Sequence, residues 1–102
     1  SMLLELSVIP VARGPSVSAD VAELVKIIDA SGLDYRLTPT GTIIEGDWDG
    51  LLELAKKCHA HMRTKTERVI TLMKVDDYGQ RRGRLTGAVA SVEEKLGKPV
   101  KK

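Results

Sequence analysis

The sequence predicts an α+β fold that forms one domain over residues 1–102. Segments with the period-two alternation of strands are interleaved with segments of helical periodicity. A content of 42% hydrophobic and 29% charged residues is typical of a globular chain. A chain of 102 residues can bury one core but has no room for a second domain. With no Phe and 3% aromatic residues, the core is expected to be aliphatic.

The first elements are a strand and a helix. Residues 3–12 alternate in polarity, which predicts a strand with one fully apolar face. Residues 18–31 then repeat apolar side chains at helical spacing. Ser16 or Ser18 is the expected N-terminal cap of this helix, and Gly32 suits a left-handed C-terminal cap.

A hairpin and a second helix are predicted next. Residues 34–38 and 42–46 are short strand candidates, and the Pro-Thr-Gly segment between them favours a tight turn. An apolar stripe at helical spacing then continues to about Arg63, with Asp47 or Asp49 as the expected cap.

The last elements are a strand and a short helix. Residues 67–77 alternate as a strand does, with apolar side chains on both faces. Residues 86–97 predict a final helix, in which Ser91 and Glu94 are expected to form a capping box.

This order of elements, joined by right-handed crossovers, predicts a ferredoxin-like βαββαβ sandwich with an additional C-terminal helix. Both helices of the βαββαβ unit then cover one face of an antiparallel sheet and leave the other face bare. Four large aliphatic side chains on a bare face predict packing against another subunit. The alternation assigns the following residues to the bare face: Glu5, Ser7, Ile9, Arg36, Thr38, Ile43, Glu45, Ile70, Leu72, Lys74 and Asp76.

The net charge and the cysteine content limit the class of protein and its expected cellular compartment. A formal net charge of +2 is too small to suggest nucleic-acid binding, and no apolar run approaches the roughly 20 residues of a membrane span. The single cysteine, Cys58, cannot form an internal disulfide, and no signal-peptide pattern is seen after Met2, which we take as the natural start. A cytoplasmic protein is therefore expected.

Little in the sequence favours catalysis. Cys58, His59 and His61 are not spaced three or four apart, so they would not share a helix face as metal ligands do. No nucleophile lies in a recognisable arrangement with a base. The arginines of the loop at residues 81–84 are more often solvated or held in a subunit contact, and a phosphate-handling enzyme is a third, weaker alternative. We expect no enzymatic activity, no metal and no cofactor.

The stretch 37–49 carries the most specific signal. Thr38, Thr42 and Glu45 could ring a pocket on the bare face, suited to a small, partly cationic ligand that forms hydrogen bonds. Alternatively, the threonines reflect strand propensity and Glu45 forms an ion pair with Lys74 across a subunit interface. The residues alone leave both interpretations open.

Four segments, ELSVIP, SGLDYRLTPTGTIIEG, KVDD and SVEEKL, make the chain resemble the thiamine-binding-protein family, the YkoF-like proteins. The resemblance spans residues 3–96 and is most specific at Y-x-L-T-P-x-G-T-x-I-E-G. Tyr78 and Gly79 depart from it, because the family pattern would continue KVDD with RRD. The resemblance implies a ferredoxin-like domain whose open sheets pack in pairs, commonly as homodimers that assemble into homotetramers.

The resemblance also implies a ligand, either thiamine or its hydroxymethylpyrimidine part. Glu5 or Glu45 would offset the thiazolium charge or accept a hydrogen bond from the amino group, and hydroxyl groups would bind the ring nitrogens. The expected function is that of a carrier, buffer or sensor, and the alternative is a structural or regulatory homo-oligomer without a small ligand. The expected ligand-binding residues are Glu5, Ser7, Thr38, Thr42, Glu45 and Lys74.

Overall fold

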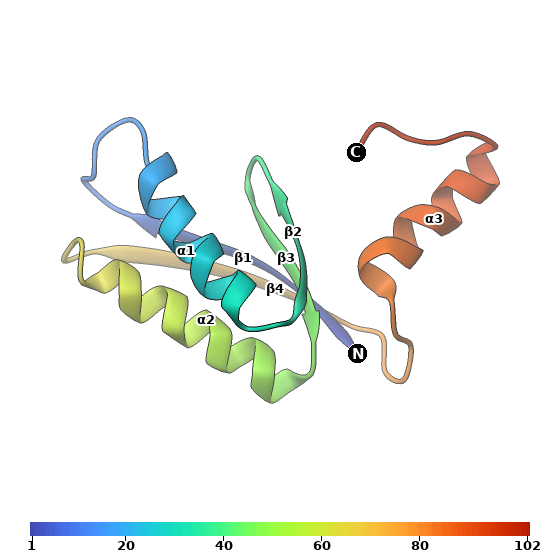
Figure 1. Cartoon of the computed structure of the whole chain (residues 1–102), viewed down its shortest axis with the longest axis horizontal. Helices are drawn as coiled ribbons and strands as arrows, with labels where there is room; N and C mark the ends of the chain where they lie inside the picture. The colour runs from blue at the N-terminus through green and yellow to red at the C-terminus, as the bar shows by residue number, and fades with distance from the viewer.

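The computed structural model describes all residues from 1 to 102 and confirms the α+β, ferredoxin-like arrangement with an additional C-terminal helix (Figure 1). The elements follow the predicted order. Their bounds are β1 (Met2–Pro10), α1 (Ser18–Ala30), β2 (Asp34–Thr38), β3 (Gly41–Gly46), α2 (Trp48–Arg63), β4 (Val69–Asp77) and α3 (Arg84–Leu96).

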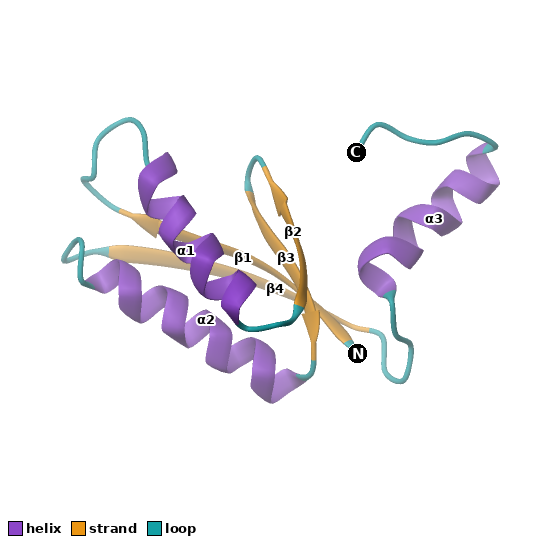
Figure 2. Ribbon diagram, in the orientation of Figure 1, coloured by secondary structure: helices purple, strands orange, loops and turns teal.

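The four strands form one antiparallel sheet in the order β2-β3-β1-β4. Leu4 pairs with Ile44 on β3 and with Val75 on β4, so these three side chains share a face of the sheet. Helices α1 and α2 lie over this face, as Figure 2 shows, and α3 stands beyond the end of the sheet.

The core lies between the sheet and these two helices. It is aliphatic, as expected, because the alternating residues of β1 and β3 meet one apolar stripe from each helix. The buried hydrophobic side chains are Leu4, Leu6, Val8, Leu24, Ile28, Ile44, Leu51, Leu54, Ala55, Cys58 and Met62.

The helix ends test the predicted caps. Asp47 caps α2 as expected, because its carboxylate accepts a hydrogen bond from the Gly50 amide at 2.7 Å. The expected serine cap of α1 is wrong: the helix begins after Val17 without a side-chain cap. The capping box in α3 is also wrong, because that helix begins at Arg84 and Ser91 lies in its interior.

The other face of the sheet is open, which leaves large apolar side chains in contact with solvent. Leu72 is 57% exposed, Ile9 is 43% exposed and Ile70 is 39% exposed. Helix α3 contributes no buried residue at all. None of the helices combines the length and the apolar character needed to cross a bilayer.

Candidate ligand pocket

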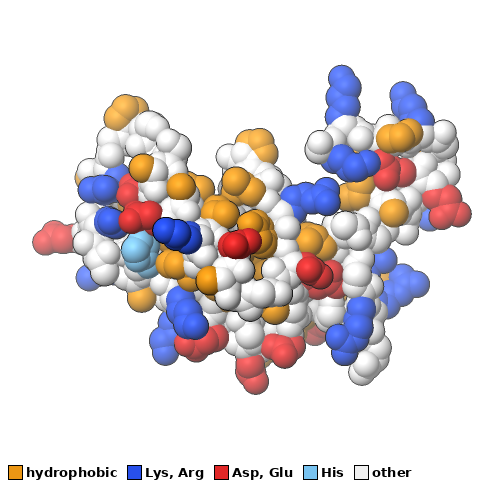
Figure 3. Space-filling model, viewed as in Figure 1, with side chains coloured by type: hydrophobic (Ala, Val, Ile, Leu, Met, Phe, Trp, Pro, Cys, Tyr) orange, Lys and Arg blue, Asp and Glu red, His pale blue; other side chains and the backbone are white.

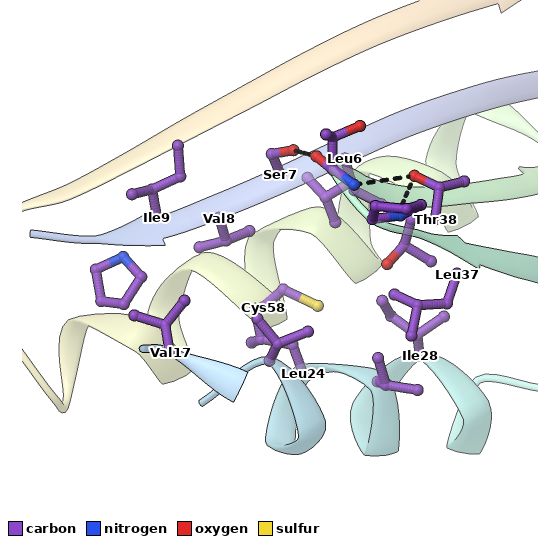
Figure 4. A pocket seen from close by; sticks show the side chains of 17 residues that line it. Leu6, Ser7, Val8, Ile9, Val17, Leu24, Ile28, Leu37, Thr38 and Cys58 are labelled. Atoms are coloured by element: carbon purple, nitrogen blue, oxygen red, sulfur yellow. Dashed lines mark hydrogen bonds between the residues drawn. The ribbon is translucent and has the colours of Figure 1, made fainter. Parts of the chain in front are cut away.

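A cavity of about 260 Å³ lies between β1, helix α1 and the β2–β3 hairpin. In Figure 4, Val8 and Leu6 of β1 line one side of it, Leu24 and Ile28 of α1 line the other, and the sulfur of Cys58 points inward. Figure 3 shows apolar side chains gathered where α1 faces the hairpin. The walls are therefore mainly aliphatic.

The cavity exists because two neighbouring strands differ in length. Strand β3 pairs with β1 only as far as Leu6, opposite Thr42, whereas β1 continues along β4 to Pro10. Beyond Leu6, no strand covers that side of β1, so the hairpin tip and α1 enclose an open space instead of a continuous sheet.

Because β3 does not extend past Leu6, some N–H and C=O groups of β1 have no strand partner for hydrogen bonding. The Val11 amide donates to the Arg68 carbonyl, so Val11 and every second residue before it direct their N–H and C=O groups toward β4. Val8 therefore directs its N–H and C=O toward the gap, where no strand pairs with them. Pro10, the next residue with this orientation, has no N–H to satisfy.

Hydrogen bonds fix the hairpin tip at the mouth of the cavity. The Ser7 hydroxyl donates to the Thr40 carbonyl at 2.7 Å, and the Thr38 hydroxyl donates to the Gly41 carbonyl at 2.9 Å. Gly41 must be small here, because a Cβ atom would lie 2.8 Å from Ser7 Oγ and 3.0 Å from the Leu6 carbonyl oxygen. These contacts hold the tip close to β1.

Two polar groups remain inside the cavity. Thr42 is 6% exposed, yet its hydroxyl has no hydrogen-bond partner in the chain and is not sealed from the cavity. Cys58 is fully buried, and this burial raises its pKa to about 11, so the thiol is neutral at physiological pH. No charged side chain lines the cavity. It can therefore offer neutral hydrogen bonds and apolar contact, but no ion pair.

Glu45 lies elsewhere, because its carboxylate holds the start of α3. Its Oε2 and Oε1 atoms accept hydrogen bonds from the amides of Arg84 and Leu85, each at 3.0 Å, and the Ser1 hydroxyl also donates to Oε2. Burial, the largest single influence, opposes ionisation of Glu45. Hydrogen bonds from Ser1, Arg84, Leu85 and the Gly83 amide together outweigh it and lower the pKa.

Glu5 and Lys74 form a separate pair on the open face. Their charged atoms lie 3.6 Å apart, with the Lys74 side chain 76% exposed, and neither residue reaches the cavity. Of the six residues expected from the sequence, the structure therefore brings together Ser7, Thr38 and Thr42. Glu5, Glu45 and Lys74 lie outside this group.

The contribution of α1 and of the β1 backbone to the cavity was not predicted from the sequence. The pocket was predicted on the open face, whereas Thr42 pairs with Leu6 and lies on the helix side. Because Thr42 and Ile44 are two residues apart, strand alternation carries the signal that would have placed Thr42 with the core. The unequal lengths of the predicted strands at 3–12 and 42–46 also pointed to an uncovered stretch of β1.

The arginines of the loop at residues 81–84 and the two histidines lie outside the cavity and make other contacts. The guanidinium groups of Arg81 and Arg84 lie 5.0 and 4.9 Å from the centre of the Tyr78 ring. His59 Nδ1 lies 2.6 Å from Thr71 Oγ1, and His61 Nε2 lies 3.7 Å from Glu23. No three His, Cys, Asp or Glu side chains come together as metal ligands.

Comparisons with known proteins place the chain among similar sequences and folds. It is 37% identical over 100 residues to a UPF0045 protein of Staphylococcus xylosus, which covers 92% of this chain and 94% of that one. It is 30% identical over 76 residues to the UPF0045 protein MJ1052 of Methanocaldococcus jannaschii, covering 74% of this chain and 76% of that one.

Two solved structures share the fold of this chain. The MJ1052 crystal structure superposes with a TM-score of 0.84 at 26% identity, covering 91% of this chain and 96% of that one. A Thermotoga maritima protein, described as a candidate thiamine biosynthesis or salvage protein, shares the fold with a TM-score of 0.70 at 16% identity, covering 94% and 95%. Residues 4–93 match the family described as thiamine-binding protein. The chain therefore belongs to the thiamine-binding-protein family.

Proposed function

We propose that this protein is a non-enzymatic binding protein for thiamine or a related aminopyrimidine, and that the pyrimidine ring occupies the cavity beside α1. The observation that carries the proposal is an uncharged, aliphatic cavity into which an unpartnered hydroxyl and an unpaired backbone N–H and C=O are directed. Ligand pockets typically combine apolar walls with a few placed polar groups of this kind.

The polar groups match the edge of an aminopyrimidine. The ring presents an amino donor next to a nitrogen acceptor, and the Val8 C=O and N–H supply the complementary acceptor and donor side by side. The Thr42 hydroxyl can donate to a further ring nitrogen. The apolar walls from Leu24 and Ile28 would contact the ring faces and the methyl substituent.

Charge decides which end of thiamine enters. A thiazolium cation inside the cavity would lose its hydration without gaining a partner, because no carboxylate lines the walls. The cationic ring would therefore remain at the mouth, in contact with water. Hydroxymethylpyrimidine alone should consequently bind nearly as well as thiamine.

The same features favour carriage, buffering or sensing over catalysis. The Cys58 thiol is held neutral by burial, and no base is placed to activate it or Thr42. We propose no chemical step on the ligand.

We also propose that the open face lies in an interface between subunits. The half-exposed aliphatic side chains on that face favour a homo-oligomer, whether or not a ligand is bound. Ser7, Ile9 and Thr38 belong to this face and also line the cavity, so ligand titration and oligomer mass are both measured to test the two proposals separately.

Calorimetric titration of the full chain with hydroxymethylpyrimidine and with thiamine tests the ligand proposal. Thr42→Val keeps the side-chain shape and removes the hydroxyl, so it should weaken binding roughly two- to tenfold. The matched control is Thr86→Val, which removes an exposed threonine hydroxyl on α3, outside the cavity. Absence of heat for both compounds at millimolar concentration, or an equal loss in the control, would overturn the proposal.

A further inference from the structure

The side chains that line the cavity beside α1 differ strongly in exposure. Leu37 is 53% exposed and Thr40 is also exposed, so these residues lie at the mouth. Leu6, Leu24 and Cys58 are buried and form the inner end of the cavity, which we call the floor. Cys58 is the lining residue that comes from α2, and Figure 4 shows its sulfur directed into the cavity. Helix α2 therefore closes the space that β1 and α1 leave between them.

The chemistry of the ligand decides which ring substituent reaches the floor. The aminopyrimidine of thiamine carries its amino group at ring position 4, a methyl group at position 2, and the carbon that bears the thiazolium at position 5. Positions 2 and 5 lie opposite each other across the ring. Because the thiazolium cation stays at the mouth, in contact with water, the 2-methyl group must point away from the mouth and toward the floor.

The polar groups of the cavity agree with this orientation. The Val8 C=O and N–H match the 4-amino group and the nitrogen at ring position 3. The nitrogen left for the Thr42 hydroxyl, which is buried and has no partner in the chain, is the one at position 1. Position 2 lies between these two nitrogens. A ring held by both contacts therefore turns its 2-substituent away from the hairpin tip.

We propose that Cys58, with its neighbours at the floor, selects the 2-substituent: the site takes 4-aminopyrimidines that carry a small alkyl group at position 2 and rejects those with a 2-oxo group, the class of the cytosines. The inference rests on the proposed function and adds the part of the ring by which ligands are distinguished. A cytosine also has a 4-amino group beside a ring nitrogen, so the Val8 backbone alone would not separate the two classes.

The floor suits a methyl group better than a carbonyl oxygen. Leu6 and Leu24 offer no hydrogen bond, and the neutral Cys58 thiol is only a weak donor. A carbonyl oxygen placed there would lose its hydration for at most one weak contact. A methyl group loses no hydrogen bond and gains apolar contact, which corresponds to about a fourfold gain in affinity for one carbon.

Calorimetric titration of the full chain with ligands that differ only at ring position 2 tests the floor. The probes are hydroxymethylpyrimidine, its 2-ethyl homologue, its analogue without a 2-substituent, and 5-hydroxymethylcytosine, which carries a 2-oxo group. The parent should bind hydroxymethylpyrimidine most tightly. The unsubstituted analogue should bind about fourfold more weakly, and 5-hydroxymethylcytosine about tenfold more weakly or worse.

Two substitutions of Cys58 should shift the preference in opposite directions. Cys58→Ala deepens the floor, so the affinity for the 2-ethyl homologue relative to hydroxymethylpyrimidine should rise about fourfold. Cys58→Val fills the floor, so the unsubstituted analogue should gain relative to hydroxymethylpyrimidine. Leu54→Val is the matched control, because Leu54 is buried one turn earlier on α2 but does not line the cavity. Urea denaturation checks that each variant is folded.

The outcomes separate this inference from the proposed function. A parent that binds none of the pyrimidines at millimolar concentration would refute both. A parent that binds hydroxymethylpyrimidine and 5-hydroxymethylcytosine equally would refute only the selection at the floor. Unchanged ligand ratios in both Cys58 variants would do the same, because a purely structural cysteine would weaken all ligands alike. Opposite shifts in Cys58→Ala and Cys58→Val, with parental ratios in Leu54→Val, are the expected result.

Discussion

The two ends of strand β3 place their polar side chains in opposite roles. At the hairpin end, Thr42 lies on the helix side of the sheet with a hydroxyl free to meet a ligand. At the other end, the Glu45 carboxylate accepts hydrogen bonds from the first two amides of α3, those of Arg84 and Leu85. The residues are three positions apart, so strand geometry puts them on opposite faces and about 10 Å from each other. Proximity in the sequence thus concealed that one of these residues lines the cavity and the other accepts from the first amides of α3.

Among the substitutions at the two ends of β3, Glu45→Gln should have the largest effect on the stability of the chain. The substitution keeps the shape but replaces a charged acceptor by a neutral one, so we expect a loss of about 1.5–3 kcal/mol in the free energy of unfolding. Urea denaturation measures it. Glu94→Gln, at an exposed position of α3, is the control and should change the free energy of unfolding little. A neutral Glu45→Gln, or one that abolishes pyrimidine binding without loss of stability, would contradict the structural role.

The pH dependence of stability tests the same carboxylate. The pKa of Glu45 is lower in the folded chain than the ordinary glutamate value near 4.3. Its contribution is therefore fully present above the unfolded pKa and is lost as the pH falls through the folded pKa. Denaturation curves of the parent and Glu45→Gln between pH 7 and pH 2 should converge toward the acid end. A constant difference across this range would contradict the prediction.

A smaller effect is expected at the hairpin end from Gly41→Ala. The new Cβ atom would approach Ser7 Oγ and the Leu6 carbonyl oxygen, and Ser7 can yield by turning away from Thr40. We expect a cost of about 1 kcal/mol together with a shifted hairpin tip. Thermal unfolding measures the first and pyrimidine titration the second. Unchanged affinity would show that the tip does not shape the cavity.

Much of the fold was predictable because its signals are local. Alternation and helical spacing located every element, and the bounds of β2 agree with the structure at both ends. The start of α3 was missed because Glu45, which accepts from the first amides of the helix, lies 39 residues before Arg84, and no local pattern reveals such a contact. Of the residues that line the cavity, the threonine-rich turn pointed to Thr38 and Thr42, and the alternation of residues 3–12 pointed to Ser7. The backbone of Val8 has no signature in its side chain and emerged only from the strand register.

The central claim is that the cavity beside α1 holds the pyrimidine ring. Amide chemical shifts of the ¹⁵N-labelled chain, followed by NMR during titration with hydroxymethylpyrimidine, test it most directly. Saturable shifts should appear at Val8 and Thr42 and be absent at Arg84 and Leu85, whose amides are held by Glu45. Shifts confined to Arg84, Leu85 and Lys74, or no shifts at millimolar ligand, would contradict the account.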